Sequence, residues 1–327
     1  MQYTSIPATS LKPSVICLGT GSFGSAISTD DSFAMLDAFA EAGGNFADSA
    51  HIYAAWLPGG AGQSERTLGK WLASRKPQNF IVGTKGGHPD LDTMDVSRLR
   101  PEDIARDLDE SLERLGLDSV DLYWLHRDAA GIPVAEILHA LDEHVRSGRV
   151  RALGASNWST ARIGEANAEA VRRGWTGFCA SQIGWSLAEV NAAVRGKGGM
   201  EWMDDGTLAW HRTTGFPAMG YSSQANGFFA HPLPPVEGPV TDKQKALASS
   251  YLSDRNRLRF GRATGLGLDR GKTAGEVALA YLWSQDFPAV AIIGPRNLAQ
   301  LRESLGASDL KLSPREIHFL EGKDARE

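Results

Sequence analysis

The fold is decided by a stretch that reads FIVGTK at Phe80–Lys85, PEDIARDLDESLERLG at 101–116 and VDLYWLH at Val120–His126. The first and last runs are apolar and short, which is typical of buried strands. In the middle run, Pro101 suits the first position of a helix and Gly116 suits its end. The apolar residues of that helix share one face, and they are Ile104, Leu108, Leu112 and Leu115. A strand, an amphipathic helix and a second strand predict a parallel βαβ unit.

The same alternation extends along most of the chain. Predicted strands are Ser14–Gly19, Asn45–Asp48, Phe80–Lys85, Val120–Leu125, Val150–Ala155, Phe178–Ile183, Pro217–Tyr221 and Ala289–Gly294. Predicted helices between and after them are Asp30–Ala42, Ser64–Ala73, Pro101–Leu115, Val134–Arg146, Thr160–Arg172 and Ala299–Leu305. Eight strands alternating with helices predict a (β/α)₈ TIM barrel.

Two stretches depart from this pattern, Gly184–Gly215 and Phe228–Leu268. The second contains HPLPPVEGP, which indicates an exposed loop. Beyond it we expect a helix over Asp242–Thr264 and another over Thr273–Gln285. Long loops on such a barrel belong to its catalytic mouth. No linker interrupts the pattern, so we expect residues 1–327 to form a single barrel domain with long mouth loops.

Composition narrows the function classes. The 327 residues are 42% hydrophobic and 22% charged, which is typical of a globular protein with a sizeable core. The net charge is −5, and no run of like charge predicts binding to nucleic acid or to an anionic membrane. The first residues do not resemble a signal peptide, and no apolar run of about 18 residues occurs, so we expect a cytoplasmic protein with a small-molecule partner. Cys17 and Cys179 lie in apolar runs and predict buried thiols rather than a disulfide scaffold.

A glycine motif offers an alternative fold. Gly19–Gly24 reads GTGSFG, which fits the dinucleotide-binding pattern G-x-G-x-x-G, and Asp48 ends the next strand. The residues that follow, SAISTDD, do not open a helix on the third glycine, and eight strands exceed the six of the Rossmann fold. We therefore favour a glycine-rich turn at the barrel mouth, where backbone can approach a ligand.

Four polar residues stand at or just after the ends of successive strands: Asp48, Tyr53, Lys85 and His126. In a barrel these ends converge on one pocket. A cation beside a phenol favours the phenolate, so Lys85 is expected to lower the pKa of Tyr53 from its ordinary value of about 10 toward neutrality, with Asp48 holding the ammonium. His126 would orient a substrate carbonyl by hydrogen bonding.

Together these residues resemble the catalytic tetrad of the aldo-keto reductase superfamily, and the resemblance extends along nearly the whole chain, with features of the branch that includes channel β-subunits. NFADSAHIY followed by SERTLGKWL is similar to the family's D-T-A-x-x-Y and S-E-x-x-L-G segments, with Ala47 and Ser49 as departures. GTKGG resembles the lysine segment, and DLYWLHRD resembles the histidine segment. The resemblance implies an NADPH-dependent oxidoreductase that reduces an aldehyde or ketone, with Tyr53 as proton donor and no metal.

Cofactor contacts are implied by further segments. GRVRALGASNWS resembles the nicotinamide carboxamide segment through Ser156 and Asn157, and SQIGWSL supplies Gln182, with Trp185 where the family often stacks a tyrosine on the ring. GYSSQANGFF resembles the pyrophosphate loop, and IIGPRNLAQLRESL resembles the 2′-phosphate and adenine segment, in which Arg296 would pair with the phosphate. The expected NADP(H) contacts are Thr20, Gly21, Asp48, Ser156, Asn157, Gln182, Trp185, Tyr221, Ser222, Ser223, Gln224, Asn226, Gly294, Arg296, Gln300, Glu303 and Ser304.

The substrate is less well specified. Expected contacts are Trp56, Trp124 and Arg127, and with Trp202 and Trp210 the tryptophans suggest a sugar-derived carbonyl. Ordinary loop packing explains the same tryptophans. A redox-sensing binding module would keep the same cofactor segments, and only turnover distinguishes it from an enzyme. A metal-dependent barrel hydrolase would need clustered ligands such as H-x-H after the first strand, which SVICLGTGS does not supply. The oligomeric state stays open.

Overall fold

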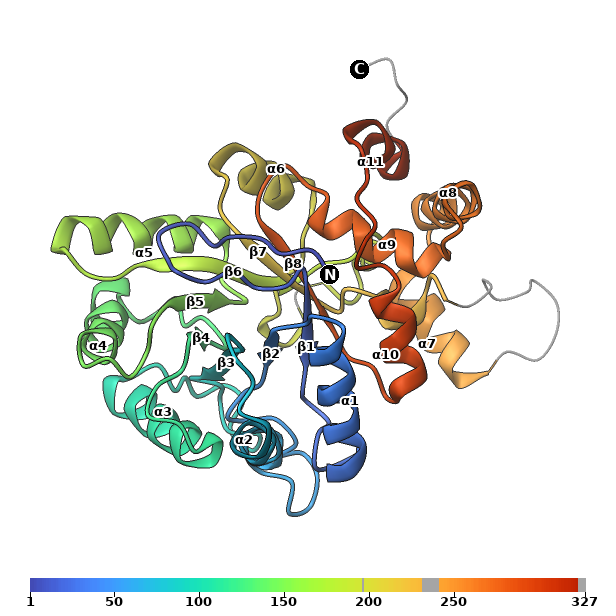
Figure 1. Cartoon of the computed structure of the whole chain (residues 1–327). Coiled ribbons are helices and arrows are strands. Elements are labelled where there is room, and N and C mark those ends of the chain that lie inside the picture. Colours follow the sequence, from blue (N-terminus) through green and yellow to red (C-terminus); the bar gives the residue numbers. More distant parts are fainter. Residues whose placement is uncertain (196, 231–240, 323–327) are drawn as a thin grey trace.

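The chain folds around a closed barrel of eight parallel strands (Figure 1). The structure, a computed structural model, describes residues 1–195, 197–230 and 241–322. Each strand pairs with the next in chain order, and the last pairs with the first. The strands are β1 (Ile16–Gly19), β2 (Phe46–Asp48), β3 (Ile81–Gly86), β4 (Leu122–Leu125), β5 (Leu153–Ser156), β6 (Phe178–Gly184), β7 (Ala218–Tyr221) and β8 (Ala289–Ile293). The predicted (β/α)₈ barrel is confirmed, and the barrel excludes the Rossmann alternative.

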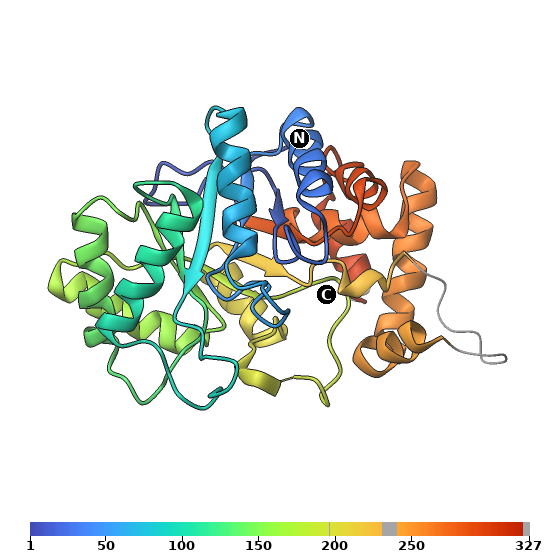
Figure 2. The same ribbon diagram turned by 90° about the horizontal axis from the view of Figure 1, so that it is seen from below.

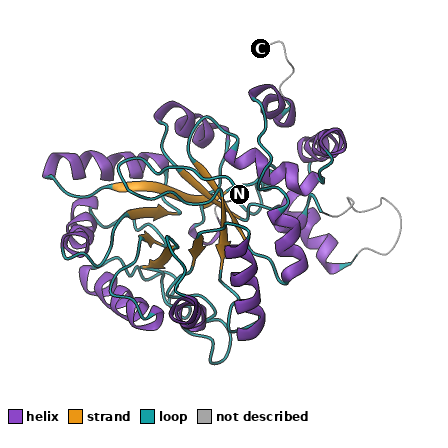
Figure 3. Cartoon of the chain, viewed as in Figure 1, coloured by secondary structure: helices purple, strands orange, loops and turns teal. Residues whose placement is uncertain are grey.

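Eleven α-helices occur in the described part of the chain, most of them in a ring around the strands (Figure 3). They are α1 (Thr29–Glu41), α2 (Gln63–Arg75), α3 (Pro101–Leu115), α4 (Val134–Arg146), α5 (Thr160–Arg173), α6 (Asp205–Thr214), α7 (Asp242–Tyr251), α8 (Asp254–Arg270), α9 (Ala274–Trp283), α10 (Leu298–Leu305) and α11 (Pro314–Glu321). Two views place α7 and α8 at one edge of the molecule (Figures 1 and 2). No helix in these ranges is long and apolar enough to span a bilayer.

Helix α3 shows how the sequence pattern produces the ring. Its apolar face is buried against the barrel, and Pro101 lies in its first turn. Gly116 ends it with a φ of 66°, a left-handed conformation that side chains disfavour. The sequence prediction for this helix is confirmed at both ends.

The helix predicted over Asp242–Thr264 is wrong as a single element. The chain leaves helical geometry at Leu252 and Ser253, and α8 begins at Asp254. The hydroxyl of Ser253 accepts a hydrogen bond of 3.2 Å from the backbone N–H of Asn256, so Ser253 caps a new helix. Helices α6 and α11 were not predicted. The loop predicted at HPLPPVEGP, residues 231–239, lies outside the described residues.

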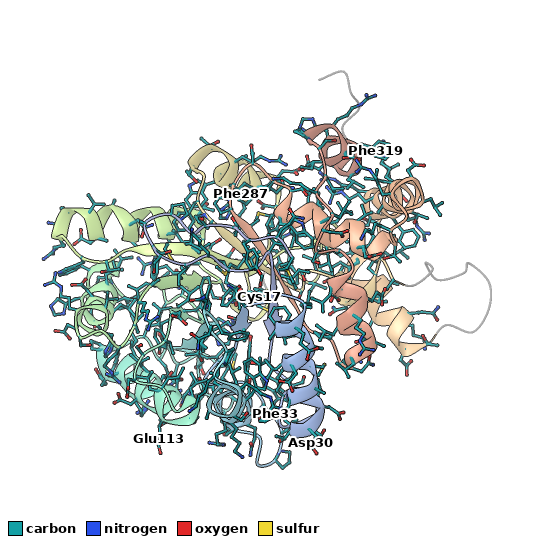
Figure 4. The ribbon with its side chains drawn as sticks, viewed as in Figure 1. Cys17, Asp30, Phe33, Glu113, Phe287 and Phe319 are labelled. Atoms are coloured by element: carbon teal, nitrogen blue, oxygen red, sulfur yellow. The ribbon has the colours of Figure 1, made fainter. Side chains whose placement is uncertain are left out.

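Strand side chains alternate between the inside of the barrel and the layer under the helices. Cys17, which Figure 4 labels near the centre of the barrel, belongs to the inner cluster with Phe46, Leu122, Trp124 and Met219. An N-terminal hairpin, joined by an antiparallel bridge between Tyr3 and Ser14, adds Ile6 and Leu11 to that cluster. Phe46 and Ile81 begin their strands, so this hairpin covers the N-terminal end of the barrel and leaves the opposite end as the mouth.

The glycine motif after β1 has a steric role at that mouth. A Cβ on Gly21 would lie 3.6 Å from the Tyr53 ring, and Gly24 has a φ of 66° with no room for a Cβ beside Thr67. Helix α1 begins only at Thr29. The turn therefore brings backbone beside the tyrosine, and its approach to a ligand stays a prediction.

Candidate active site

The ammonium of Lys85 is the centre of the candidate site. The inward side of β3 carries Lys85, which is 1% exposed. Its Nζ donates hydrogen bonds of 2.5 Å to the carboxylate of Asp48, 2.7 Å to the carbonyl of Ser49 and 3.0 Å to the hydroxyl of Tyr53. Burial lowers the pKa of Lys85, but Asp48 and Tyr53 outweigh that effect and raise it overall. All three hydrogens of a charged ammonium are thus used.

Tyr53 lies on the loop between β2 and α2, which is fixed to β3 by its backbone. The backbone N–H of His51 donates a hydrogen bond of 2.8 Å to the backbone carbonyl of Lys85. Because this bond fixes the loop to β3, Tyr53 is held over the lysine. The Tyr53 ring faces that of His126 edge-on at 5.9 Å and that of Trp56 at 6.4 Å. Trp56 is 55% exposed and forms part of the rim.

The electrostatic effect on Tyr53 differs from the sequence expectation. Burial of the phenol raises its pKa above the ordinary value, Lys85 lowers it, and the negative charge of Asp48 raises it again. The net direction is upward, so the expected shift toward neutrality is wrong. At neutral pH the phenol keeps its proton, which suits a proton donor better than a base.

His126 follows β4 and is 8% exposed. Burial, followed by the charge of Lys85, holds the pKa of His126 well below its usual value, so the imidazole is neutral at physiological pH. Its Nδ1 has no hydrogen-bond partner within the described chain. The ring of His88 packs against it at 4.8 Å. Sequence reasoning missed His88, although GTKGGHP places a histidine just beyond the lysine strand.

Four expected cofactor residues, Ser156, Asn157, Gln182 and Tyr221, lie on or directly after β5, β6 and β7. Asn157, at a φ of 59°, donates from its amide nitrogen to the carbonyl of His126 at 3.2 Å and to Ser156. Its amide oxygen accepts a hydrogen bond of 2.7 Å from the hydroxyl of Tyr221. Gln182 donates a hydrogen bond of 3.1 Å to the carboxylate of Asp48. This bond connects the wall that these four residues form to Lys85 and its partners.

Trp185 is not at this wall, which corrects the expectation that it stacks on a nicotinamide. Gln182 points into the barrel, so the alternation of a strand directs the residue three positions later outward. The indole is 3% exposed and stacks on Phe287 at 5.8 Å, in the layer between barrel and helices. Figure 4 labels Phe287 beside α6, away from the central Cys17. The inward aromatic ring on this side is that of Tyr221.

Other expected contacts are also placed differently. Trp124 is fully buried inside the barrel against Gly154, so it offers no surface to a substrate. Trp210 packs on Phe216 ahead of β7, at the end opposite the mouth. Thr20 is fully buried, and its hydroxyl contacts the backbone carbonyl of Asp48 and the hydroxyl of Ser64 rather than the mouth.

The loop after β7 and the start of α10 form the expected phosphate and adenosine region. Ser222, Ala225 and Asn226 all have positive φ, which turns the chain tightly and leaves Asn226 exposed. Ser223 is buried and donates 2.7 Å to the carbonyl of Ile292, so its hydroxyl faces the barrel wall instead of a phosphate. The amide of Gln224 donates 3.0 Å to Ser304, which is buried, and this bond joins the two segments.

The remaining expected contacts are exposed together beside that loop. Gly294 and Arg296 follow β8, and the backbone N–H of Arg296 donates 2.9 Å to the side chain of Gln300. Glu303 lies one turn further along α10 and is exposed. This group presents a guanidinium, amides and a carboxylate, the chemistry that suits a phosphorylated ribose and an adenine. No group of three His, Cys, Asp or Glu able to hold a metal ion occurs in the described chain.

The fold and this cluster define a barrel enzyme of the oxidoreductase class. Residues 15–325 match the aldo/keto reductase family, and the chain belongs to that family. It is 30% identical over 326 residues to the uncharacterized oxidoreductase YrpG of Bacillus subtilis (strain 168), covering 98% of this chain and 95% of that protein.

Other relatives bear specific names. The chain is 26% identical to norsolorinic acid reductase stcV of Emericella nidulans, covering 96% of this chain and 79% of that one. It is 25% identical to aldo-keto reductase yakc [NADP(+)] of Schizosaccharomyces pombe, covering 91% and 83%. The fold matches a crystal structure of the thermostable aldo-keto reductase Tm1743 with a TM-score of 0.74 at 22% identity, covering 98% of this chain and 99% of that one.

Proposed function

We propose that this protein reduces an aldehyde or ketone to an alcohol with NADPH, with Tyr53 as the general acid. The observation that carries the proposal is the contact of Lys85 with both Tyr53 and Asp48 at the mouth. When bound, the dinucleotide supplies a hydride to the carbonyl carbon. Tyr53 supplies the proton to the carbonyl oxygen, which completes the alcohol.

Each neighbour of Tyr53 has a defined part in that transfer. Lys85 donates to the phenol oxygen and stabilises the negative charge that develops when the proton leaves. Asp48 keeps the ammonium in place. Neutral His126 lies beside the phenol and can donate a hydrogen bond to the substrate carbonyl, which orients it for protonation.

The chain's polar groups fit NADP(H). Asn157, Ser156 and Gln182 form a polar wall suited to a carboxamide, and Tyr221 offers the aromatic face that Trp185 does not. Exposed Arg296 suits a 2′-phosphate, which motivates the proposed preference for NADPH. The name of the yeast relative, which includes NADP(+), supports the same choice.

A carbonyl panel tests the proposal. The purified protein is mixed with NADPH and with aldehydes, ketones, sugars and sugar aldehydes, and NADPH absorbance is followed over time. Consumption that depends on a carbonyl compound supports a reductase. Tight NADPH binding without turnover across the panel would instead favour a cofactor-sensing module. Of the tryptophans typical of a sugar site, Trp124 and Trp210 lie away from the mouth, so only Trp56 and Trp202 favour a sugar-derived carbonyl.

A further inference from the structure

Arg127 directly follows the catalytic candidate His126 and is held in place through its backbone. The indole N–H of Trp158 donates 3.0 Å to the carbonyl of Arg127. The side chain of Arg127 folds back, and its Nη1 donates 2.9 Å to the carbonyl of His126. Gly199, from the loop after β6, lies over the arginine stem, because a Cβ on it would be 3.9 Å from Cδ. The guanidinium is therefore half-buried at the rim of the mouth.

This cation has no counter-ion among the described residues. Among the ion pairs of the described residues, none includes Arg127, and its buried Nε has no hydrogen-bond partner. The adjacent carboxylate of Asp128 accepts from the backbone of Ala129 and from Arg162 instead. A half-buried charge without a partner is unfavourable unless a ligand supplies one.

The titratable groups on the floor of the mouth supply no anion to Arg127. Asp48 is paired with Lys85, and burial lowers the pKa of both His88 and His126, so both imidazoles are neutral at physiological pH. The phenols of Tyr221 and Tyr53 lie near enough that their deprotonated forms would raise the pKa of Arg127, so the guanidinium is close to the reacting groups. A second buried donor without a partner, the indole N–H of Trp202, lies beside Tyr221.

We propose that the carbonyl compound this site takes carries a carboxylate, which Arg127 binds while Tyr53 and His126 hold the carbonyl oxygen. The proposal rests on the proposed reductase function and adds the substrate class. A carboxylate fits because a guanidinium forms charge-assisted hydrogen bonds with it, and the second terminal nitrogen of Arg127 has no hydrogen bond to any described residue. A neutral or polyhydroxy carbonyl would leave the charge uncompensated.

The test compares 3-carboxybenzaldehyde with 3-formylbenzamide, which has the same shape and no charge. The readout is the ratio of kcat/KM for the acid to kcat/KM for the amide, at saturating NADPH. A charge-assisted bond is worth roughly ten- to hundredfold in affinity, so the wild-type protein should prefer the acid by about that factor. Arg127→Gln keeps a donor for the carbonyl of His126 but removes the charge, and its ratio should fall to about 1.

Two further variants separate recognition from folding. Arg127→Lys keeps the charge without the planar guanidinium, so its ratio should lie between those of the wild type and Arg127→Gln. Arg195→Gln removes an arginine of the loop after β6 that already has a partner in Asp204, at 3.4 Å, and its ratio should match the wild type. If Arg127→Gln fails to fold, the ordering of wild type and Arg127→Lys still decides the proposal.

Failure of this inference can be told apart from failure of the reductase function. A wild-type protein that reduces both aldehydes with equal kcat/KM would overturn the role of Arg127 and leave the reductase intact. If no carbonyl is reduced, benzoate and benzamide are titrated against tryptophan fluorescence in the presence of NADPH. Benzoate binding that weakens at least tenfold in Arg127→Gln supports the anion site, whereas equal binding of the two compounds overturns it.

Discussion

Lys85 donates a hydrogen bond of 3.0 Å to the hydroxyl of Tyr53 from the floor of the barrel mouth. The distance places a positive charge beside the oxygen that would become negative when the phenol gives up its proton. Because the same ammonium also binds Asp48 at 2.5 Å, the lysine cannot move away without breaking a buried ion pair. The relationship leads directly to tests of proton transfer.

Tyr53→Phe should remove carbonyl reduction and preserve cofactor binding. The variant keeps the ring that packs against Gly21 and lacks only the proton donor. General acid catalysis contributes typically 10²- to 10⁴-fold, so kcat should fall by about that range. NADPH affinity, measured by fluorescence titration, should stay within about twofold. A variant with substantial turnover would contradict the assignment of the acid.

The pH dependence of reduction should reflect a raised pKa of Tyr53. The acid form is the active one, so the rate stays level through neutral pH and falls only when the phenol loses its proton, at alkaline pH. The measurement is kcat/KM for one aldehyde against pH. Lys85→Met removes the charge that lowers the phenol pKa, and its alkaline limb should move to still higher pH. A descending limb centred near neutrality would argue against this picture.

Arg296→Ala should weaken NADPH far more than NADH. The side chain is exposed beside Gln300, where a 2′-phosphate would find a cation. A lost charge-assisted bond costs about 1.5–3 kcal/mol, or roughly ten- to hundredfold in affinity. Arg302→Ala, which removes another exposed arginine from α10, is the matched control. If Arg296→Ala weakens the binding of NADPH and NADH equally, this arginine does not bind the 2′-phosphate.

Trp185→Ala should destabilise the fold rather than loosen the cofactor directly. The indole is buried against Phe287 and Tyr281. Its removal leaves a cavity that should lower the free energy of unfolding by about 3–5 kcal/mol. Urea unfolding measures that loss, and Trp185→Phe should recover part of it. If Trp185→Ala keeps native stability but binds NADPH weakly, Trp185 contacts the cofactor and the packing role is wrong.

Acid should destabilise the protein through its buried and half-buried histidines. Burial lowers the pKa of His88, His126, His144 and His211 from 6.5, so the folded chain binds fewer protons than the unfolded chain below that pH. The stabilisation is present above 6.5 and decreases as pH falls toward the folded pKa values, by up to about 1.4 kcal/mol per pH unit for each group. Melting temperatures between about pH 7 and 5 should show a smaller decline for His126→Gln than for the exposed control His139→Gln.

Much of the fold could be predicted because strand and helix periods are local properties. The eight strands were each recognised from short apolar runs, and α3 from its apolar face and its two end residues. The sequence pattern is continuously helical across Ser253, so the end of α7 and the start of α8 are not visible in it. The signal that was available is an N-cap serine directly before Asp254. Helix α11 was missed although Ser313, Pro314 and Glu316 form a readable start signal with a capping box.

The candidate site was less accessible to sequence reasoning. Positions at strand ends identified Asp48, Lys85 and His126, because a barrel brings such ends together. The orientation of Trp185 could have been obtained by counting from Gln182, since strand residues at odd separations face opposite sides. The direction of the Tyr53 pKa could not be obtained, because it depends on how strongly burial competes with Lys85 in three dimensions.

Lys85 also has a practical property in protein chemistry. Amine-reactive reagents need an accessible, unprotonated nitrogen, and the Lys85 ammonium is 1% exposed with every N–H engaged. Lys12, Lys70 and Lys76 are exposed, so they would react first. Dyes, biotin or a solid support could therefore be attached through surface lysines while the nitrogen beside Tyr53 stays unmodified.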